Sequence, residues 1–125
     1  YYKGSFIVYS DQIKNQLLQI DSKKILKHGS VSSQIAKEMV ISASNIISTD
    51  ISIAITGLSG PNSDSSNKKI GTVFIAIKYF EEIFISEYKL NYDRETHRFI
   101  ASQIALNNLR LIMMNKWSDN IYKLK

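Results

Sequence analysis

The 125 residues, 44% hydrophobic and 22% charged, suit one globular domain with its own core, and no apolar run approaches the about 20 residues of a membrane-spanning helix. The lack of cysteine excludes disulfides and thiolate metal sites, and the two histidines, His28 and His97, lack metal-ligand spacing, so we expect no metal. A net charge of +5 suits nucleic-acid binding, but the lysines fall in separate segments without interleaved aromatic residues, so we expect no specific nucleic-acid or membrane partner.

The N-terminal segment predicts a strand followed by a short helix. Residues 5–9 (Ser-Phe-Ile-Val-Tyr) are aromatic, β-branched and continuously apolar, which is typical of a strand covered on both faces. Ser10 or Asp11 can cap a helix start, and apolar residues recur at helical spacing over residues 13–20. Lys14 therefore falls on the first turn of a helix directly after a buried strand, where α/β folds often line a cleft.

The next segments predict one long helix and a second strand. Residues 21–30 are polar and lysine-rich, and we assign them to no helix or strand. Ser32 is a good N-cap, and the apolar residues of 35–47 form one stripe with a period close to 3.6, in which Met39 belongs to the core. Residues 51–56 then predict a strand.

A Gly-rich turn follows that strand. Gly57, Gly60 and Pro61 fall within five residues, which predicts a backbone in unusual dihedrals. Either an ordinary surface loop or a binding site built on a rigid scaffold would suit this stretch. Polar residues 62–69 predict a flexible loop, and residues 71–79 and 83–90 predict a hairpin.

The last helix completes the predicted fold. Asp93 can cap it, and a buried apolar stripe runs over residues 100–113. Arg94 and Arg98 lie one turn apart at its start, as a solvated basic face or as a pair of anion clamps; spacing alone favours the solvated face. The order strand, helix, helix, strand, strand, strand, helix predicts an α/β fold, a three-layer α/β/α sandwich with a mixed sheet, as a single domain over residues 1–125.

Several short motifs together resemble one known family, over nearly the whole chain. They occur at residues 4–10 with Lys14 four residues on, at 28–32 (His-Gly-Ser-Val-Ser), at 56–61 (Thr-Gly-Leu-Ser-Gly-Pro), at 71–73 (Gly-Thr-Val), and at Asp93-Arg94 with Arg98. Each motif is weak alone, but their order and spacing are specific. The chain resembles the C-terminal domain of the competence/damage-inducible protein CinA, whose stand-alone members are nicotinamide-nucleotide amidases.

The resemblance implies an enzyme that hydrolyses the carboxamide of nicotinamide mononucleotide to the acid and ammonia, with a serine nucleophile, a lysine base and no metal or cofactor. By position, Lys14 is that lysine, and Tyr9 lies near the site. A lysine serves as base only if partial burial or a neighbouring cation depresses its pKa, and the start of a helix also disfavours the ammonium. The remaining implied residues contact the substrate: Thr56, Gly57, Ser59 and Gly60 at the turn, and Arg94 and Arg98 at the phosphate.

The family nucleophile lies in a Glu-Ser-Cys-Thr-Gly-Gly motif that this sequence lacks. We therefore expect that the chain has either lost the N-terminal strand and helix that carry this motif or been cut from a longer protein. As it stands, we expect it not to hydrolyse the amide. We expect Ser59 not to act as a substitute nucleophile, because nothing ties its position to Lys14. The alternative function is a catalytically silent CinA-like domain that binds a nucleotide or a partner protein. The resemblance further implies a cytoplasmic homodimer that binds a pyridine nucleotide.

Overall fold

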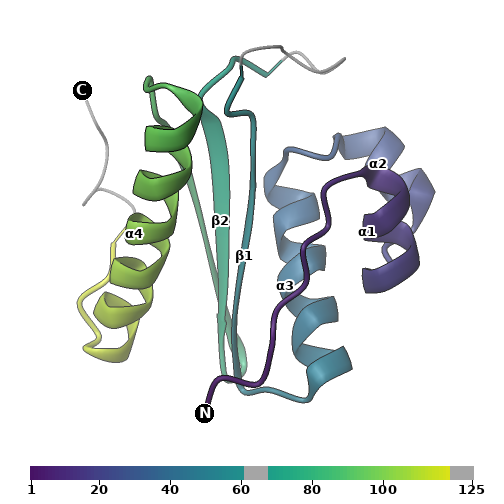
Figure 1. Ribbon diagram of the computed structural model, residues 1–125. Helices are drawn as coiled ribbons and strands as arrows, with labels where there is room; N and C mark the ends of the chain where they lie inside the picture. The colour runs from purple at the N-terminus through teal and green to yellow at the C-terminus, as the bar shows by residue number, and fades with distance from the viewer. Residues whose placement is uncertain (61–67, 119–125) are drawn as a thin grey trace.

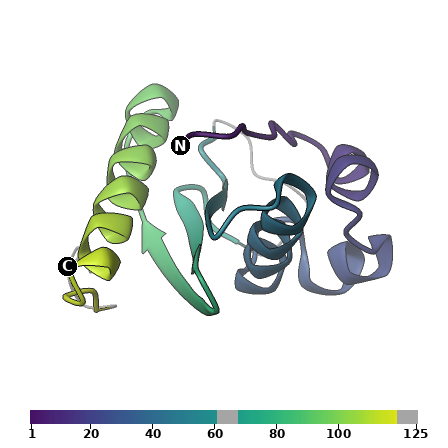
Figure 2. The same cartoon turned by 90° about the horizontal axis from the view of Figure 1, so that it is seen from below.

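Three antiparallel strands lie between two helical layers in the computed structural model, which describes residues 1–60 and 68–118. Helices α1, α2 and α3 lie on one side of the sheet and α4 on the other (Figures 1 and 2). The three-layer α/β prediction is confirmed. In chain order the elements are α1 (Asp11–Leu18), α2 (Ser22–His28), α3 (Ser33–Ile47), β1 (Ile51–Gly57), β2 (Thr72–Tyr79), β3 (Glu82–Lys89) and α4 (Arg94–Met113).

The sheet differs from the predicted mixed sheet, because its described strands are all antiparallel, in the order β1-β2-β3. The register pairs Ile51 with Tyr79 and Gly57 with Val73, so the end of β1 lies beside the start of β2. Strands β2 and β3 form the predicted hairpin, with Tyr79 opposite Glu82. A parallel partner would have come from residues 5–9, which form no strand.

Residues 5–9 were predicted to be a buried strand, and this prediction is wrong. Phe6 and Val8 are partly buried and pack against the hydrophobic core, whereas Ile7 and Tyr9 are 87% and 86% exposed. The segment thus covers the core with one face only. Its β propensity was read correctly from the sequence, but a strand also needs a neighbouring backbone to pair with, and propensity does not supply one.

Helix α2 was not predicted. The Asp21 side chain caps it by accepting a hydrogen bond from the backbone N–H of Lys23, and Gly29 ends it. Ile25 is the only residue of α2 that is buried. A single buried position creates no hydrophobic periodicity, so the sequence pattern could not predict this helix.

The central strand β2 is buried on both faces and separates two apolar clusters. Met39 is 6% exposed and belongs to the cluster on the α3 side, as predicted. The α3 cluster includes Leu18, Ile20, Ile35, Val40 and Phe74, and the α4 cluster includes Val73, Ile75, Ile77, Leu90 and Ala105. This packing fixes α1, α3 and β1 relative to one another, which positions the candidate site.

Candidate functional site

Lys14 is a buried lysine that reaches across three segments of the chain. The Ser10 hydroxyl caps α1 by accepting a hydrogen bond from the backbone N–H of Ile13, so Lys14 lies in the first turn, as predicted. The residue is only 5% exposed. Its Nζ lies 3.3 Å from the carbonyl oxygen of Ser30 and 3.4 Å from Thr56 Oγ1, and it also hydrogen-bonds the Ser30 hydroxyl.

Thr56 joins the same cluster from the end of β1. It is 6% exposed, and its hydroxyl donates a hydrogen bond of 2.8 Å to the carbonyl oxygen of Ser30. Because Thr56 Oγ1 donates to Ser30, its lone pairs are available to accept from Lys14. The structure therefore brings together two predicted site residues, Lys14 and Thr56, which are 42 positions apart in the sequence.

Ser30 is the residue that sequence reasoning missed. It lies in the connection between α2 and α3 and is half-buried, so its hydroxyl sits at the boundary between the buried amine and the surface. The motif at residues 28–32 contained it but assigned it no role. Two neighbouring residues could have pointed to it. Gly29 ends α2 and Ser32 caps α3, and together they define the short connection that contains Ser30.

The Gly-rich turn forms a second part of the site and is pinned from two sides. Leu58 donates its backbone N–H to the carbonyl of Thr72 at 2.9 Å, and Arg94 donates Nη1 to the carbonyl oxygen of Gly60 at 2.8 Å. Gly60 has φ +75°, and a Cβ there would lie 3.1 Å from a side-chain carbon of Ile70. The turn thus requires glycine at this position and depends on the start of α4 for support.

The other predicted site residues lie in different surroundings. Tyr9 and Arg98 line a groove of about 1110 Å³ between the N-terminal segment, α3, β1 and α4. Within the described part of the chain, no hydrogen bond joins Tyr9 to Lys14 or Arg98 to Arg94. Ser59 is half-buried, and Gly57 ends β1 beside Val73. Most of the predicted loop at 62–69 lies outside the described residues, namely 62–67.

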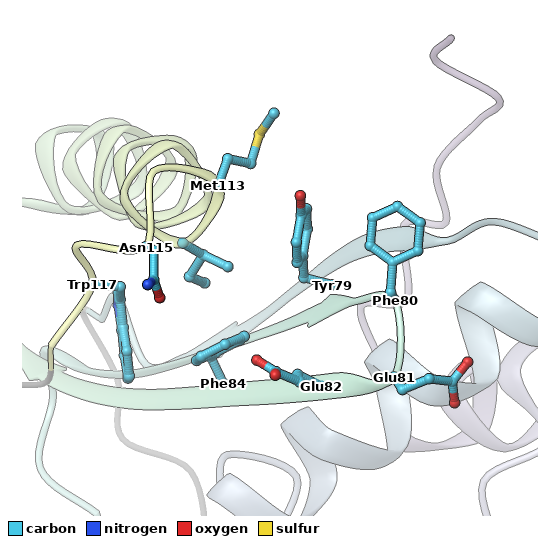
Figure 3. A pocket seen from close by; sticks show the side chains of 9 residues that line it. Tyr79, Phe80, Glu81, Glu82, Phe84, Met113, Asn115 and Trp117 are labelled. Atoms are coloured by element: carbon cyan, nitrogen blue, oxygen red, sulfur yellow. The ribbon is translucent and has the colours of Figure 1, made fainter.

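A smaller hollow of about 450 Å³ lies at the opposite end of the strands (Figure 3). Tyr79 and Phe84 line it from the hairpin, and Trp117 lies against Phe84 with ring centroids 5.3 Å apart. Tyr79 pairs with the first residue of β1, whereas Thr56 lies near the last. None of the predicted site residues lines this hollow.

His97 is a buried side chain to which the sequence motifs assign no role. It is 3% exposed, and its Nε2 lies 3.3 Å from the carbonyl oxygen of Gly71, at the start of β2. Its Nδ1 is buried and has no hydrogen-bond partner among the described residues. The contact ties α4 to the strand beside the Gly-rich turn.

Within residues 1–60 and 68–118, no group of three His, Cys, Asp or Glu side chains is arranged to hold a metal ion. None of the helices in that part of the chain is long and apolar enough to cross a membrane.

Comparison with known sequences gives one consistent result. A family model described as the CinA C-terminal domain matches residues 1–113. A CinA-like protein of Prochlorococcus marinus strain MIT 9515 is 37% identical over 122 residues, covering 92% of the chain and 27% of that relative. A CinA-like protein of Geotalea uraniireducens strain Rf4 is 33% identical, covering 97% of the chain and 29% of the relative. The chain therefore spans less than a third of the length of these curated relatives.

Solved structures agree with the sequence comparison. A competence-damaged protein (CinA) superfamily protein from Escherichia coli superposes with a TM-score of 0.81 at 28% identity, over 84% of this chain and 61% of that chain. The competence damage-inducible protein A from Klebsiella pneumoniae gives 0.82 at 26% identity, over 89% of this chain and 68% of that chain. The likeness thus extends from the motifs to the backbone.

Proposed function

The chain belongs to the CinA C-terminal domain family, and we propose on this basis that it is the base-bearing part of a nicotinamide-nucleotide amidase. The reaction is hydrolysis of the carboxamide of nicotinamide mononucleotide to nicotinate mononucleotide and ammonia. Lys14 is the general base in this proposal. A Ser motif of the family type, outside the 125 residues, supplies the nucleophile.

The buried amine of Lys14 is the observation that carries the proposal. A lysine is a base only in its neutral form, and burial disfavours the charged form. Oxygen atoms of Ser30 and Thr56 hold the amine in place. Ser30 is only half-buried, so the cluster is accessible from the surface at this residue. A fixed, water-shielded amine is what a serine hydroxyl needs in order to become a nucleophile.

Substrate contacts in the proposal come from the turn at residues 57–60 and from the arginines. Backbone groups of the turn and the Ser59 hydroxyl contact the nucleotide. Arg94 already donates to Gly60, which leaves the other N–H groups of its guanidinium for a phosphate. Arg98 lies one helical turn further along α4 and is exposed, and it lines the same groove as Tyr9 of the N-terminal segment.

A second candidate function is supported by one sequence observation. The 125 residues hold no Glu-Ser-Cys-Thr-Gly-Gly motif. A domain that binds the nucleotide or a partner protein without turnover does not need this motif. A homodimer and a cytoplasmic location belong to both proposals. Sedimentation velocity of the purified protein tests the first, and fractionation of cells tests the second.

Ammonia release from nicotinamide mononucleotide, measured on the protein encoded by the complete reading frame, separates the two functions. The amidase proposal predicts release that falls with Arg94→Ala through a raised KM for the mononucleotide, with little change for the riboside that lacks the phosphate. A folded protein that binds the nucleotide but releases no ammonia would support the silent binding domain instead.

A further inference from the structure

Both the hydroxyl and the backbone carbonyl of Ser30 contact the buried Lys14 amine. Its Oγ hydrogen-bonds Lys14 Nζ, and its carbonyl oxygen lies 3.3 Å from the same nitrogen. Ser59, the serine weighed from sequence as a nucleophile, has no hydrogen bond to Lys14 among the described contacts. The geometry of a nucleophile and its base is therefore met at Ser30.

Three oxygen atoms of Ser30 and Thr56 surround Lys14 Nζ. The carbonyl oxygen of Ser30 can only accept, and Thr56 Oγ1 has already used its proton toward that carbonyl. Lys14 Nζ also donates to the Ser30 hydroxyl, so these oxygens hold the amine within proton-transfer reach of Ser30 Oγ.

We infer that Ser30 is a nucleophile activated by Lys14, which gives this chain an acyl-transfer centre of its own for carboxylic amides and esters. The inference rests on the proposed function in taking Lys14 as a base, and it adds a second nucleophile to that site. Lys14 Nζ takes the proton from Ser30 Oγ while Oγ bonds to the carbonyl carbon. The carbon–nitrogen or carbon–oxygen bond then breaks, and the proton passes from Lys14 to the leaving group. Lys14 Nζ then takes a proton from water while the water oxygen bonds to the acyl carbon. The bond between that carbon and Ser30 Oγ breaks, the acid leaves, and Lys14 returns the proton to Oγ.

The backbone around Ser30 suits this role. Gly29 has φ +83° and ψ 148°, a conformation that side chains rarely adopt, so Ser30 emerges from a sharp turn at the end of α2. Three residues later α3 begins, and its first amides carry the positive end of a 15-residue helix dipole. Negative charge that develops on a carbonyl oxygen near that end is stabilised.

A fluorophosphonate probe tests the inference on the chain itself. Nucleophilic attack on phosphorus forms a P–O bond and expels fluoride, and mass spectrometry of peptides locates the adduct. We expect a single adduct at Ser30, lost in Ser30→Ala and formed about a hundredfold more slowly in Lys14→Met, in line with the usual contribution of a general base. Ser33→Ala is the matched control, because the Ser33 hydroxyl faces Gln34 and should leave labelling unchanged.

A thiol variant keeps the test decisive if the probe fits the site poorly. The chain has no cysteine, so Ser30→Cys introduces the only thiol. Its alkylation by iodoacetamide should be at least about tenfold faster with Lys14 present than in the Ser30→Cys, Lys14→Met double variant. Circular dichroism and thermal unfolding establish that each variant is folded. Equal alkylation rates in folded variants, together with no adduct at Ser30 in the parent chain, would overturn the inference.

The test of Ser30 can fail or succeed independently of the test of the proposed amidase function. An adduct at Ser30 without ammonia release from the mononucleotide would retain the Ser30 centre and reject the proposed substrate. Ammonia release that survives Ser30→Ala, with no adduct at Ser30, would retain the amidase and place its nucleophile elsewhere.

Discussion

Thr56 shows how much of the site one hydroxyl determines. It donates to the carbonyl of Ser30 and accepts from Lys14, so it links the end of β1 to both α1 and the connection before α3. The resemblance to the family pointed to Lys14 and Thr56, whose side chains lie 3.4 Å apart in the structure. Their shared contact through Ser30 could not be predicted, because no local pattern records which residues meet across 26 positions of sequence.

Thr56→Val keeps the shape of the side chain and removes its hydroxyl. We expect the free energy of unfolding to fall by about 1–3 kcal/mol, because Ser30 loses a donor and Lys14 an acceptor in a buried cluster. Ile55→Val is the neighbouring control, since Ile55 is 38% exposed and should cost less than about 0.5 kcal/mol. Urea unfolding measures both. A loss for Thr56→Val no larger than that for Ile55→Val would show that the cluster is not stabilising.

Among the helices and strands, those with a regular apolar pattern were predicted well, and the helix with a single buried residue was not predicted. Helix α3 has an apolar stripe from end to end and was found with its N-cap, Ser32. Helix α2 has one buried residue and was missed. The hairpin was found despite an unusual turn, in which Phe80 has φ +54°. Such a turn depends on pairing of the strands rather than on its own sequence.

The start of β2 requires glycine at position 71. Gly71 has φ +95°, and a Cβ there would lie 2.8 Å from the carbonyl oxygen of Leu90. We expect Gly71→Ala to lower the free energy of unfolding by more than Gly29→Ala, which costs about 1–3 kcal/mol for its backbone conformation alone. Gly29 is the matched control because it also has positive φ, at +83°, with no atom within 4 Å of a Cβ. Equal losses in denaturant unfolding would contradict the steric explanation.

The cap of α4 makes stability depend on pH. Hydrogen bonds from the side chain and then the backbone of Thr96 hold the pKa of the Asp93 carboxyl below its usual value of 3.8. Because the folded pKa lies below the unfolded one, the contribution is complete above pH 3.8 and is lost as pH falls through the folded pKa. The stability gap between the parent chain and Asp93→Ala should therefore narrow between pH 5 and pH 2, as followed by urea unfolding. A gap that stays constant over this range would refute the role of the charged cap.

At the scale of the molecule, the sequence predicted the layers but not the pairing of the sheet. Apolar stripes on the helices and a doubly buried β2 lead to three layers with either a mixed or an antiparallel sheet. The choice rested on residues 5–9, whose Ile7 and Tyr9 are exposed along the groove bordered by β1 and α4. The order of the motifs pointed to Lys14 and Thr56, which the structure brings together, whereas the contacts of Ser30 and His97 depend on how distant segments pack.

The most direct measurement is the kcat for ammonia release from nicotinamide mononucleotide by Lys14→Met in the protein encoded by the complete reading frame. Lys24→Met is its control, because Lys24 is exposed and pairs with Glu38 at 3.0 Å, away from the cluster. We predict that Lys14→Met lowers kcat at least about a hundredfold while Lys24→Met leaves it unchanged. A folded Lys14→Met protein that keeps most of its kcat would remove Lys14 from the reaction and contradict the account.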